Sequence, residues 1–518
     1  MSRRQAIPGG CPEWLRLCRW VEGFYWIRCV AFVALWALQF SAVAAVVPCR
    51  IEVVEQGTGW PVPLVELKTT HHVAFYTDNA GVVAVSTPEL LGREVFFHVS
   101  ADGYEVSADG FGFSGVRLRP EPGLTLRVEV RRTMIARRLG RLTGAGLFAE
   151  SQSTGRDTDW KESGVFGCDS VQTVLHQGRR HWLWGDTTLP HYPLGLFDSL
   201  GAESEARPFE RFDPPIRPFF EFRRDGPGRL RGVTPMSGEG PTWATALVSL
   251  RARDGSPRLV CSYCKVRGHL EAYEWGLAVW NETSQKFERL KVLWTRSAAS
   301  PQPPPLPVGH AVPWKDPAGR DWILFAHPFP ALRCPATFEA WQDPATWEPL
   351  EPQEELRSAH DGSKLRPHDG VHSGGMGWQS WRRRWVTVFL QSGGTPSTLG
   401  ELWYAEAAAP TGPWGPAVKV PTHRNHTFYN PCRISTSHRP TPRSCSSKAL
   451  TPGSSRATQS PRRATTTTRS SIAWISTIPA SAPLKSIPKS HCDARRSMAF
   501  RFAVNQIRKP FPDPVSVP

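Results

Sequence analysis

Apolar and polar residues alternate over short stretches between residues 46 and 431, and turn residues interrupt the pattern about every ten positions. The stretch LTLRVEV at 124–130 alternates strictly, which is the period of a strand with one buried face. The pattern therefore predicts an all-β chain built from antiparallel sheets.

Residues 46–133 carry the first group of these strands. Two apolar stretches flank a Gly-Trp-Pro turn at 59–61, and Asp78-Asn79-Ala80-Gly81 marks a tight turn further on. We expect a small antiparallel β-sandwich here. Residues 134–146 are basic and rich in glycine, which favours a linker or a single helical turn over a regular helix.

Residues 147–431 repeat one layout, and 16 of the 22 tryptophans fall there, between Trp160 and Trp414. An apolar strand is followed by a Gly or Asp turn, a Trp-rich strand and two further strands, first in VFGCDSVQTVLHQGRRHWLWGDT at 165–187. Five copies begin at similar intervals, at Asp169, Thr242, His310, His372 and Tyr429. A repeated four-stranded unit predicts a five-bladed β-propeller, incomplete because the fifth copy stops at residue 431.

The tail at 432–518 breaks this pattern, with 15 Lys or Arg against 2 Asp or Glu and many Ser, Thr and Pro residues. Such a composition is typical of a disordered basic segment. A reading-frame shift near Cys432 is the interpretation we favour, because in the offset frame the Thr run at 465–468 would encode Tyr, His, Asn or Asp. The ring of blades could not then close.

Residues 1–45 combine five arginines with an apolar run that ends in small residues. This order predicts an export signal cleaved near Ala44, and hence a secreted or periplasmic protein. The apolar run is also long enough to remain as a single membrane anchor, which is the alternative. The protein would contact a membrane only in that second case.

The distribution of charge argues against a nucleic-acid partner, and the cysteines argue against a disulfide framework or a metal site. The net charge of +16 lies in the two ends, since 46–431 holds 42 basic and 42 acidic residues. A groove for nucleic acid is therefore not expected. The 11 cysteines are scattered and form no disulfide framework, although one bridge is compatible with export. Cys261 and Cys264 lie in an apolar stretch and are predicted to face opposite sides of a strand rather than to hold a metal.

Chemistry in such a ring is expected where the innermost strand of each blade begins. Hydrolysis of a glycoside requires two carboxylates, and Asp169 as base with Glu239 as acid is the predicted catalytic pair. Other polar residues at the strand starts are predicted to bind substrate: His310, Asp369, His372 and Tyr429. An acid at a strand start can instead simply cap backbone N–H groups. Trp182 and Trp184 are expected to pack within blades, and no metal or cofactor is expected.

Two resemblances add to this picture. TGWPVPLVELKTT at 58–70, FYTDNAGVV at 75–83 and GYE at 103–105 resemble the carboxypeptidase regulatory-like domain, a transthyretin-like β-sandwich usually found as an accessory module. GCDSV and HWLWGDT, with LWYAEAAAPTGPWGPAVKV at 402–420 and FYNP at 428–431, resemble five-bladed propellers of the glycoside hydrolase family 43 type. That family uses two Asp and one Glu from three successive blades, and His310 here stands where the third blade would supply an acid.

The sequence thus predicts an exported carbohydrate-active protein, a glycoside hydrolase acting on a polysaccharide through its funnel. The alternative is a non-catalytic module that binds a polysaccharide or a cell-surface partner. The oligomeric state is left open.

Overall fold

The computed structural model describes residues 46–144, 149–160, 163–207, 214–351, 356–365, 371–380, 382–391, 394, 399–423, 426–434, 470–477 and 499–508. Nearly all regular structure in these ranges is β, with only the short helices α2 (Glu150–Ser153), α3 (Phe338–Trp341) and η3 (Pro344–Thr346). The predicted all-β class is confirmed. Within these ranges no helix has the length and apolar character needed to cross a membrane. The predicted export signal or anchor lies outside the described residues.

Residues 49–132 form a sandwich of two four-stranded sheets, ordered β4-β1-β8-β6 and β3-β2-β5-β7. Strand β1 runs parallel to β8, while the other neighbouring strands are antiparallel. Apolar residues of both sheets fill the space between them. The strands are β1 (Cys49–Glu55), β2 (Glu66–Thr69), β3 (Ala74–Tyr76), β4 (Val82–Val85), β5 (Val95–Ser100), β6 (Tyr104–Glu105), β7 (Gly115–Leu118) and β8 (Thr125–Arg132).

The local sequence explains these strands. Along β8 the side chains alternate between exposed and less exposed positions, as the LTLRVEV pattern predicts. The predicted tight turn before β4 is present, because the Gly81 N–H donates to the Asp78 carbonyl over 3.0 Å and Gly81 has a φ of +71°. The Asp78 carboxylate also accepts from the N–H groups of Ala80 and Val82, which fixes the turn.

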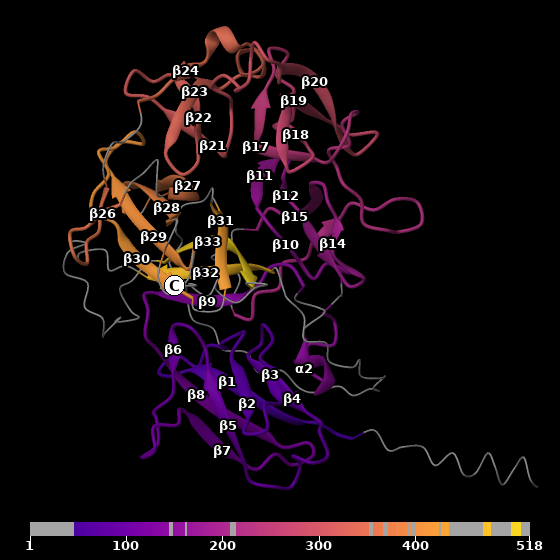
Figure 1. Ribbon diagram of the computed structural model, residues 1–518, viewed down its shortest axis with the longest axis vertical. Helices are drawn as coiled ribbons and strands as arrows, with labels where there is room; N and C mark the ends of the chain where they lie inside the picture. The colour runs from indigo at the N-terminus through magenta and orange to yellow at the C-terminus, as the bar shows by residue number, and fades with distance from the viewer. Residues whose placement is uncertain are drawn as a thin grey trace, which may run out of the picture. The chain divides into compact units, whose positions relative to one another are not determined.

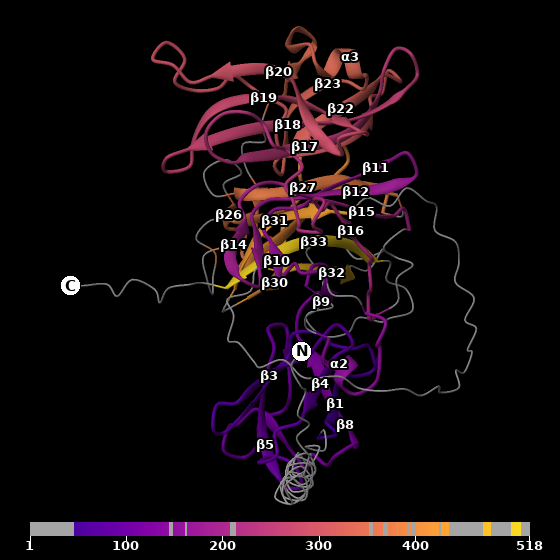
Figure 2. The same ribbon diagram turned by 90° about the vertical axis from the view of Figure 1, so that its right-hand side faces the viewer.

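Five further four-stranded antiparallel sheets follow. Figure 1 shows the first strand of each, β11, β17, β21, β27 and β31, around a common centre. Figure 2 shows β17 to β20 side by side as one sheet. The first four blades are β11 (Gln172–His176), β12 (Arg179–Trp184), β15 (Leu200–Glu205), β16 (Glu221–Phe222); β17 (Thr242–Arg251), β18 (Pro257–Arg267), β19 (Glu271–Asn281), β20 (Lys286–Thr295); β21 (His310–Lys315), β22 (Asp321–Ala326), β23 (Pro330–Pro335), β24 (Glu348–Pro349); and β27 (Val371–Gln379), β28 (Arg384–Gln391), β29 (Glu401–Ala407), β30 (Val418–Thr422).

Two small sheets accompany the blades. One is β10 (Gly167–Cys168), β13 (Thr187–Leu189) and β14 (Tyr192–Leu196), and the other is β25 (Leu356–Arg357) with β26 (Lys364–Leu365). The predicted starts of the repeats agree closely with the inner strands, since β17 begins at Thr242 and β21 at His310.

The fifth blade differs from the prediction in two ways. Its order is β31-β33-β32-β9, so β31 (His426–Arg433) is followed by β33 (Ala499–Arg508) and β32 (Ser470–Thr477) from the tail. Its last strand is β9 (Ala136–Arg141), where a linker or helical turn was expected. The tail therefore contains two strands rather than none, because the unpaired edges of β31 and β9 each offer a row of backbone donors and acceptors.

Each junction between neighbouring blades has its own apolar core. At the junction of the first and fifth blades, Trp182 and Trp184 are each only 1 % exposed and stack with ring centroids 5.7 Å apart. The prediction that these two tryptophans serve packing is confirmed. Because all five junctions are filled, the ring of blades is closed.

Strand β9 pairs with β32 in the fifth blade, and its side chains also bond to residues of the sandwich. Arg137 makes two hydrogen bonds to the Glu55 carboxylate, of 2.6 and 2.8 Å. Arg138 is 2 % exposed and donates to the carbonyls of Pro63, Leu64 and Asp102 over 3.0–3.2 Å. A buried guanidinium is tolerated here because backbone oxygens accept its N–H groups.

Candidate functional site

The candidate site is the end of the ring where the five inner strands begin. The Gln172 side chain joins the first three blades there. Its Nε2 donates to Thr245 Oγ1 over 3.2 Å and to the Gly309 carbonyl over 3.0 Å, while its Oε1 accepts from Leu247 N–H over 2.9 Å. One amide group thus fixes three strand starts relative to one another.

A second set of hydrogen bonds joins the remaining blades. Ser373 Oγ, on β27, accepts from the Asn430 N–H over 3.2 Å, and Asn430 Nδ2 donates to Ser170 Oγ over 2.6 Å. Ser170, Ala246 and Asn430 all have positive φ, of 45°, 54° and 43°. Such conformations are uncommon for residues with side chains, and they occur here at the mouth of the ring. The mouth is therefore a preorganised, polar rim.

Asp169 lies at this rim between β10 and β11 and is partly exposed. Its N–H donates to the Asp186 carbonyl and its own carbonyl accepts from the Gly185 N–H, both over 2.8 Å. A side chain at residue 185 would overlap the Oδ1 atom of Asp169. Gly185 is thus required for the position of the Asp169 carboxylate.

Three histidines, which we call the funnel histidines, belong to the same region: His310 begins β21, His327 follows β22 and His372 lies on β27. Burial and the neighbouring His327 lower the pKa of His310 to about 3. Burial and His372 lower the pKa of His327 to about 4, and burial lowers the pKa of His372. All three are neutral near pH 7, so each offers one donor and one acceptor.

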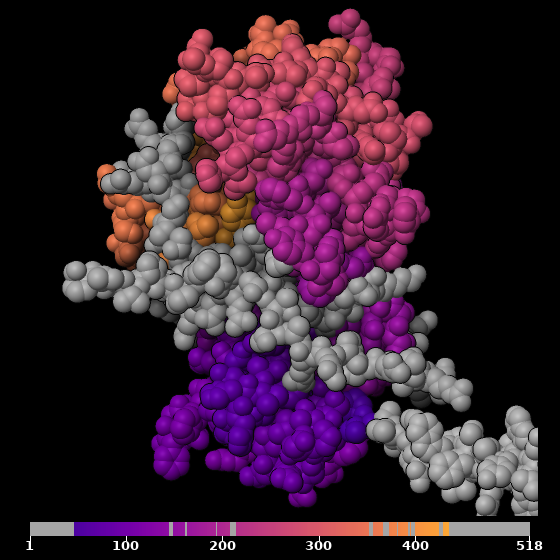
Figure 3. All heavy atoms as spheres, turned by 45° about the vertical axis from the view of Figure 1, so that its right-hand side comes forward, coloured from indigo at the N-terminus to yellow at the C-terminus, as the bar shows by residue number. Residues whose placement is uncertain are grey.

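The surface of His327 is accessible to solvent, yet the protein atoms around it lower its pKa as burial would. Both hold if the imidazole lines a depression, where water reaches it but protein surrounds it on most sides. Figure 3 shows the orange and yellow surface of the later blades set back between the first and third. The Tyr429 ring lies 5.2 Å from that of His372 and adds an aromatic group.

Glu239 has a different setting from the one predicted for an inner-strand residue. It is exposed in the loop before β17, and its carbonyl accepts from the Tyr273 hydroxyl over 2.8 Å, above the third strand of the blade. Buried Lys265 fastens this loop, since its Nζ donates to the carbonyls of Met236 and Gly240 over 3.1 and 3.0 Å. The pairing of Asp169 with Glu239 stays a prediction. The other predicted residue, Asp369, lies outside the described part of the chain.

Sequence reasoning missed Asp198, a carboxylate between the first two blades. Burial raises its pKa, although Oδ1 accepts from Ser199 N–H over 2.7 Å and from Thr234 Oγ1 over 2.9 Å. A raised carboxyl pKa is typical of a general acid, but these bonds equally describe a turn-capping role. Nothing in the local sequence distinguishes Asp198 from other turn residues.

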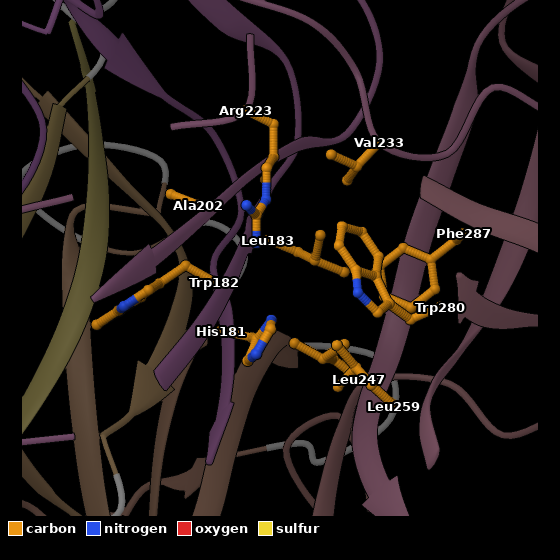
Figure 4. A pocket seen from close by; sticks show the side chains of 11 residues that line it. His181, Trp182, Leu183, Ala202, Arg223, Val233, Leu247, Leu259, Trp280 and Phe287 are labelled. Atoms are coloured by element: carbon orange, nitrogen blue, oxygen red, sulfur yellow. The ribbon is translucent and has the colours of Figure 1, made fainter. Parts of the chain in front are cut away.

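A second feature missed by sequence reasoning is a pocket between the first two blades. Figure 4 shows His181 and Arg223 on one side of it and Trp280 with Phe287 on the other. His181 is 8 % exposed, and its ring lies 5.4 Å from that of His176 and 6.3 Å from that of Trp280. His181 meets Trp280 only because the first two blades pack together, so no local sequence motif predicts this pocket.

The cysteines behave as structural residues. All six that the structure describes are buried and form no disulfide. Cys261 and Cys264 lie on β18, as the predicted strand requires. In the ranges that the structure covers, no three His, Cys, Asp or Glu side chains are arranged to hold a metal ion.

No protein-family model matches this chain, and no curated protein is a significant sequence match. Solved structures similar to it include an exo-1,5-α-L-arabinanase from a bovine ruminal metagenomic library, at 8 % identity and a TM-score of 0.33, covering 66 % of this chain and 94 % of that one. A GH43_1 enzyme from Xanthomonas citri complexed with xylotriose matches at 9 % identity and a TM-score of 0.30, over 60 % and 81 % of the two chains. A Cellvibrio cellulosa α-L-arabinanase mutant matches at 7 % identity and a TM-score of 0.31, over 60 % and 86 %. At these values the similarity carries no conclusion about activity.

Proposed function

We propose that the mouth of the propeller binds a carbohydrate. The observation that carries the proposal is the combination, on one preorganised rim, of a partly exposed carboxylate, Asp169, with three histidines that are neutral near pH 7. Sugar hydroxyls both donate and accept hydrogen bonds. Neutral imidazoles and a carboxylate offer the complementary groups without the excess positive charge that a phosphate ligand would need.

Tyr429 extends this argument, because an aromatic ring beside His372 can stack against the C–H face of a sugar. The similar structures described above act on arabinan or are complexed with xylotriose, so arabino- and xylo-oligosaccharides are the first ligands to test. Export from the cytoplasm remains part of the proposal and rests on residues 1–45 alone.

Glycoside hydrolysis is the second candidate, favoured by the Asp169 carboxylate at the rim. Hydrolysis requires a second carboxyl group about 5 to 9.5 Å away, and Glu239 is the predicted acid. Glu239 lies beside the third strand of its blade and not beside the inner strand, where Asp169 is found. Binding without turnover is therefore the simpler proposal.

Calorimetric titration of the full chain with arabino- and xylo-oligosaccharides tests the proposal. Asp169→Asn and His310→Gln should each weaken binding at least tenfold, whereas His269→Gln, at an exposed turn, should leave it unchanged. Release of reducing ends from the same sugars, abolished in Asp169→Asn and in Glu239→Gln, would establish hydrolysis. Unchanged affinity in both Asp169→Asn and His310→Gln would refute the site.

A further inference from the structure

The outer face of the sandwich sheet β3-β2-β5-β7 carries an unusual set of side chains, which we call the aromatic face: Glu66, Lys68, Tyr76, Phe96, His98, Phe113 and Arg117. Alternation within the strands buries Leu67, Phe75 and Phe97 in the sandwich core. It therefore turns their neighbours in sequence outward.

The rings on this face contact one another. Phe96 lies 4.9 Å from His98 and 6.4 Å from Phe113, and His98 lies 5.9 Å from Phe113, all measured between ring centroids. Gly115 on β7 lies opposite His98 and leaves room for the Phe96 ring. A Cβ atom at residue 115 would be only 2.6 Å from Phe96 Cζ, which is too close for a van der Waals contact. The rings thus form one cluster on the sheet.

The turn that presents Phe113 is well defined. Asp109 Oδ1 accepts from the N–H groups of Phe111 and Phe113 over 2.9 and 3.0 Å. Phe113 is nevertheless 54 % exposed and Phe111 is 89 % exposed. The turn therefore holds two large aromatic side chains in contact with water, and exposed apolar groups of this kind often mark a binding surface.

Charged groups lie beside this ring cluster. Lys68 is paired in register with His98, and Glu66 with Tyr76, whose hydroxyl donates to the Glu66 carboxylate. The Arg117 guanidinium lies 5.7 Å from the Phe96 ring centroid. Arg117 has no ion-pair partner within the described residues, while Glu66 is 4.0 Å from Lys68. The face therefore has one more cation than carboxylate.

We propose that the aromatic face binds a polysaccharide strand that carries carboxylates, that is, a uronate-containing polymer. A pyranose ring has an apolar C–H face for Phe96 and Phe113 and polar edges for Lys68 and Glu66. A uronate carboxylate supplies the missing partner of Arg117, which can hold it through two parallel hydrogen bonds. The centre of a protein–protein interface is depleted of Lys and Glu, whereas Lys68 and Glu66 lie on the strand next to the ring cluster. The inference rests on the proposed carbohydrate function and adds a second site with its own ligand class.

Binding of the full chain to polygalacturonate, compared with neutral arabinan, by affinity electrophoresis tests this inference. Phe113→Ala should weaken retention by polygalacturonate at least tenfold. Arg117→Gln should weaken it several-fold and reduce its dependence on salt, with a smaller effect on arabinan. Matched controls are Phe219→Ala, an exposed aromatic of the propeller at 56 %, and Arg119→Gln, an exposed arginine two residues further on; both should behave as the unchanged chain.

The outcomes separate the two proposals. No retention of the unchanged chain by polygalacturonate, or equal retention of Phe113→Ala, overturns the aromatic face as a polysaccharide site. A change in sedimentation coefficient in Phe113→Ala with retention unaffected would assign the face to contact between copies of the chain, and also overturns it. Loss of oligosaccharide binding in Asp169→Asn bears on the funnel alone, because that variant should retain its affinity for polygalacturonate.

Discussion

The junction of the first two blades should make the protein sensitive to mild acid, and His181 is the group responsible. Burial first, then the nearby His176, Arg223 and Arg179, lower the pKa of His181 to about 3. Among the described residues, the carboxylate that pairs with His181 is Glu203, at 3.7 Å, which Arg179 and Arg223 already engage, so it offsets little of this decrease. On the second blade, Glu282 faces His176 at 3.9 Å and Ser249 bonds to its ring over 2.8 Å.

The change in the free energy of unfolding with pH follows from the difference in the His181 pKa between the folded and the unfolded state. In the unfolded chain a histidine has a pKa of about 6.5, so its folded pKa is depressed. The unfolded state therefore takes up a proton first, and stability that is present above pH 6.5 is lost as the pH falls toward 3. Each pH unit in that window costs about 1.4 kcal/mol, so His181 alone should reduce the free energy of unfolding by about 2 kcal/mol between pH 7 and pH 5.

Urea unfolding followed by tryptophan fluorescence at pH 7.5, 6 and 5 measures this loss. His181→Gln should be somewhat less stable at pH 7.5, because its ring packs against Trp280, yet should lose about 2 kcal/mol less than the unchanged chain between pH 7 and pH 5. His269→Gln, on the surface, should retain the full acid dependence. An identical acid dependence in His181→Gln would refute the reasoning.

Two further predictions concern the positions of side chains. Gly185→Ala should displace the Asp169 carboxylate and weaken oligosaccharide binding at least tenfold by calorimetry, whereas Gly110→Ala, with open space around it, should not; equal affinities would show that the Asp169 carboxylate is not part of the site. Arg138→Ala should lower the free energy of unfolding by about 3 kcal/mol, because three buried or half-buried carbonyls lose their donor, and exposed Arg131→Ala by less than about 0.5 kcal/mol; similar urea midpoints for the two would contradict this assignment.

The inner strands were predictable because their signals are local. Thr242 and His310 follow turn residues and begin alternating apolar stretches, so the period of the pattern locates them directly. Trp182 and Trp184 were placed in the packing for the same reason, since alternate positions in a strand face the same side.

Strand β9 could not be found in this way. Its residues are basic and include Gly140, and the partner that makes them a strand is β32, more than 300 positions later. The site was predictable only in part, because Gln172 and Asn430 are ordinary amides whose role depends on which strands the closed ring brings together. The contact of His181 with Trp280 likewise depends on the packing of the second blade against the first.

The separation between β9 and β32 also has a consequence for synthesis. At about 5 to 20 residues per second, the segment that pairs with β9 leaves the ribosome tens of seconds after β9 itself. During that time the strand has an unpaired edge, which in most sequences would invite association with other chains. The sandwich precedes β9 in the chain and supplies the groups that bind its side chains, Glu55 for Arg137 and the carbonyls of Pro63, Leu64 and Asp102 for Arg138, so β9 has a folded neighbour to hold it until the tail arrives.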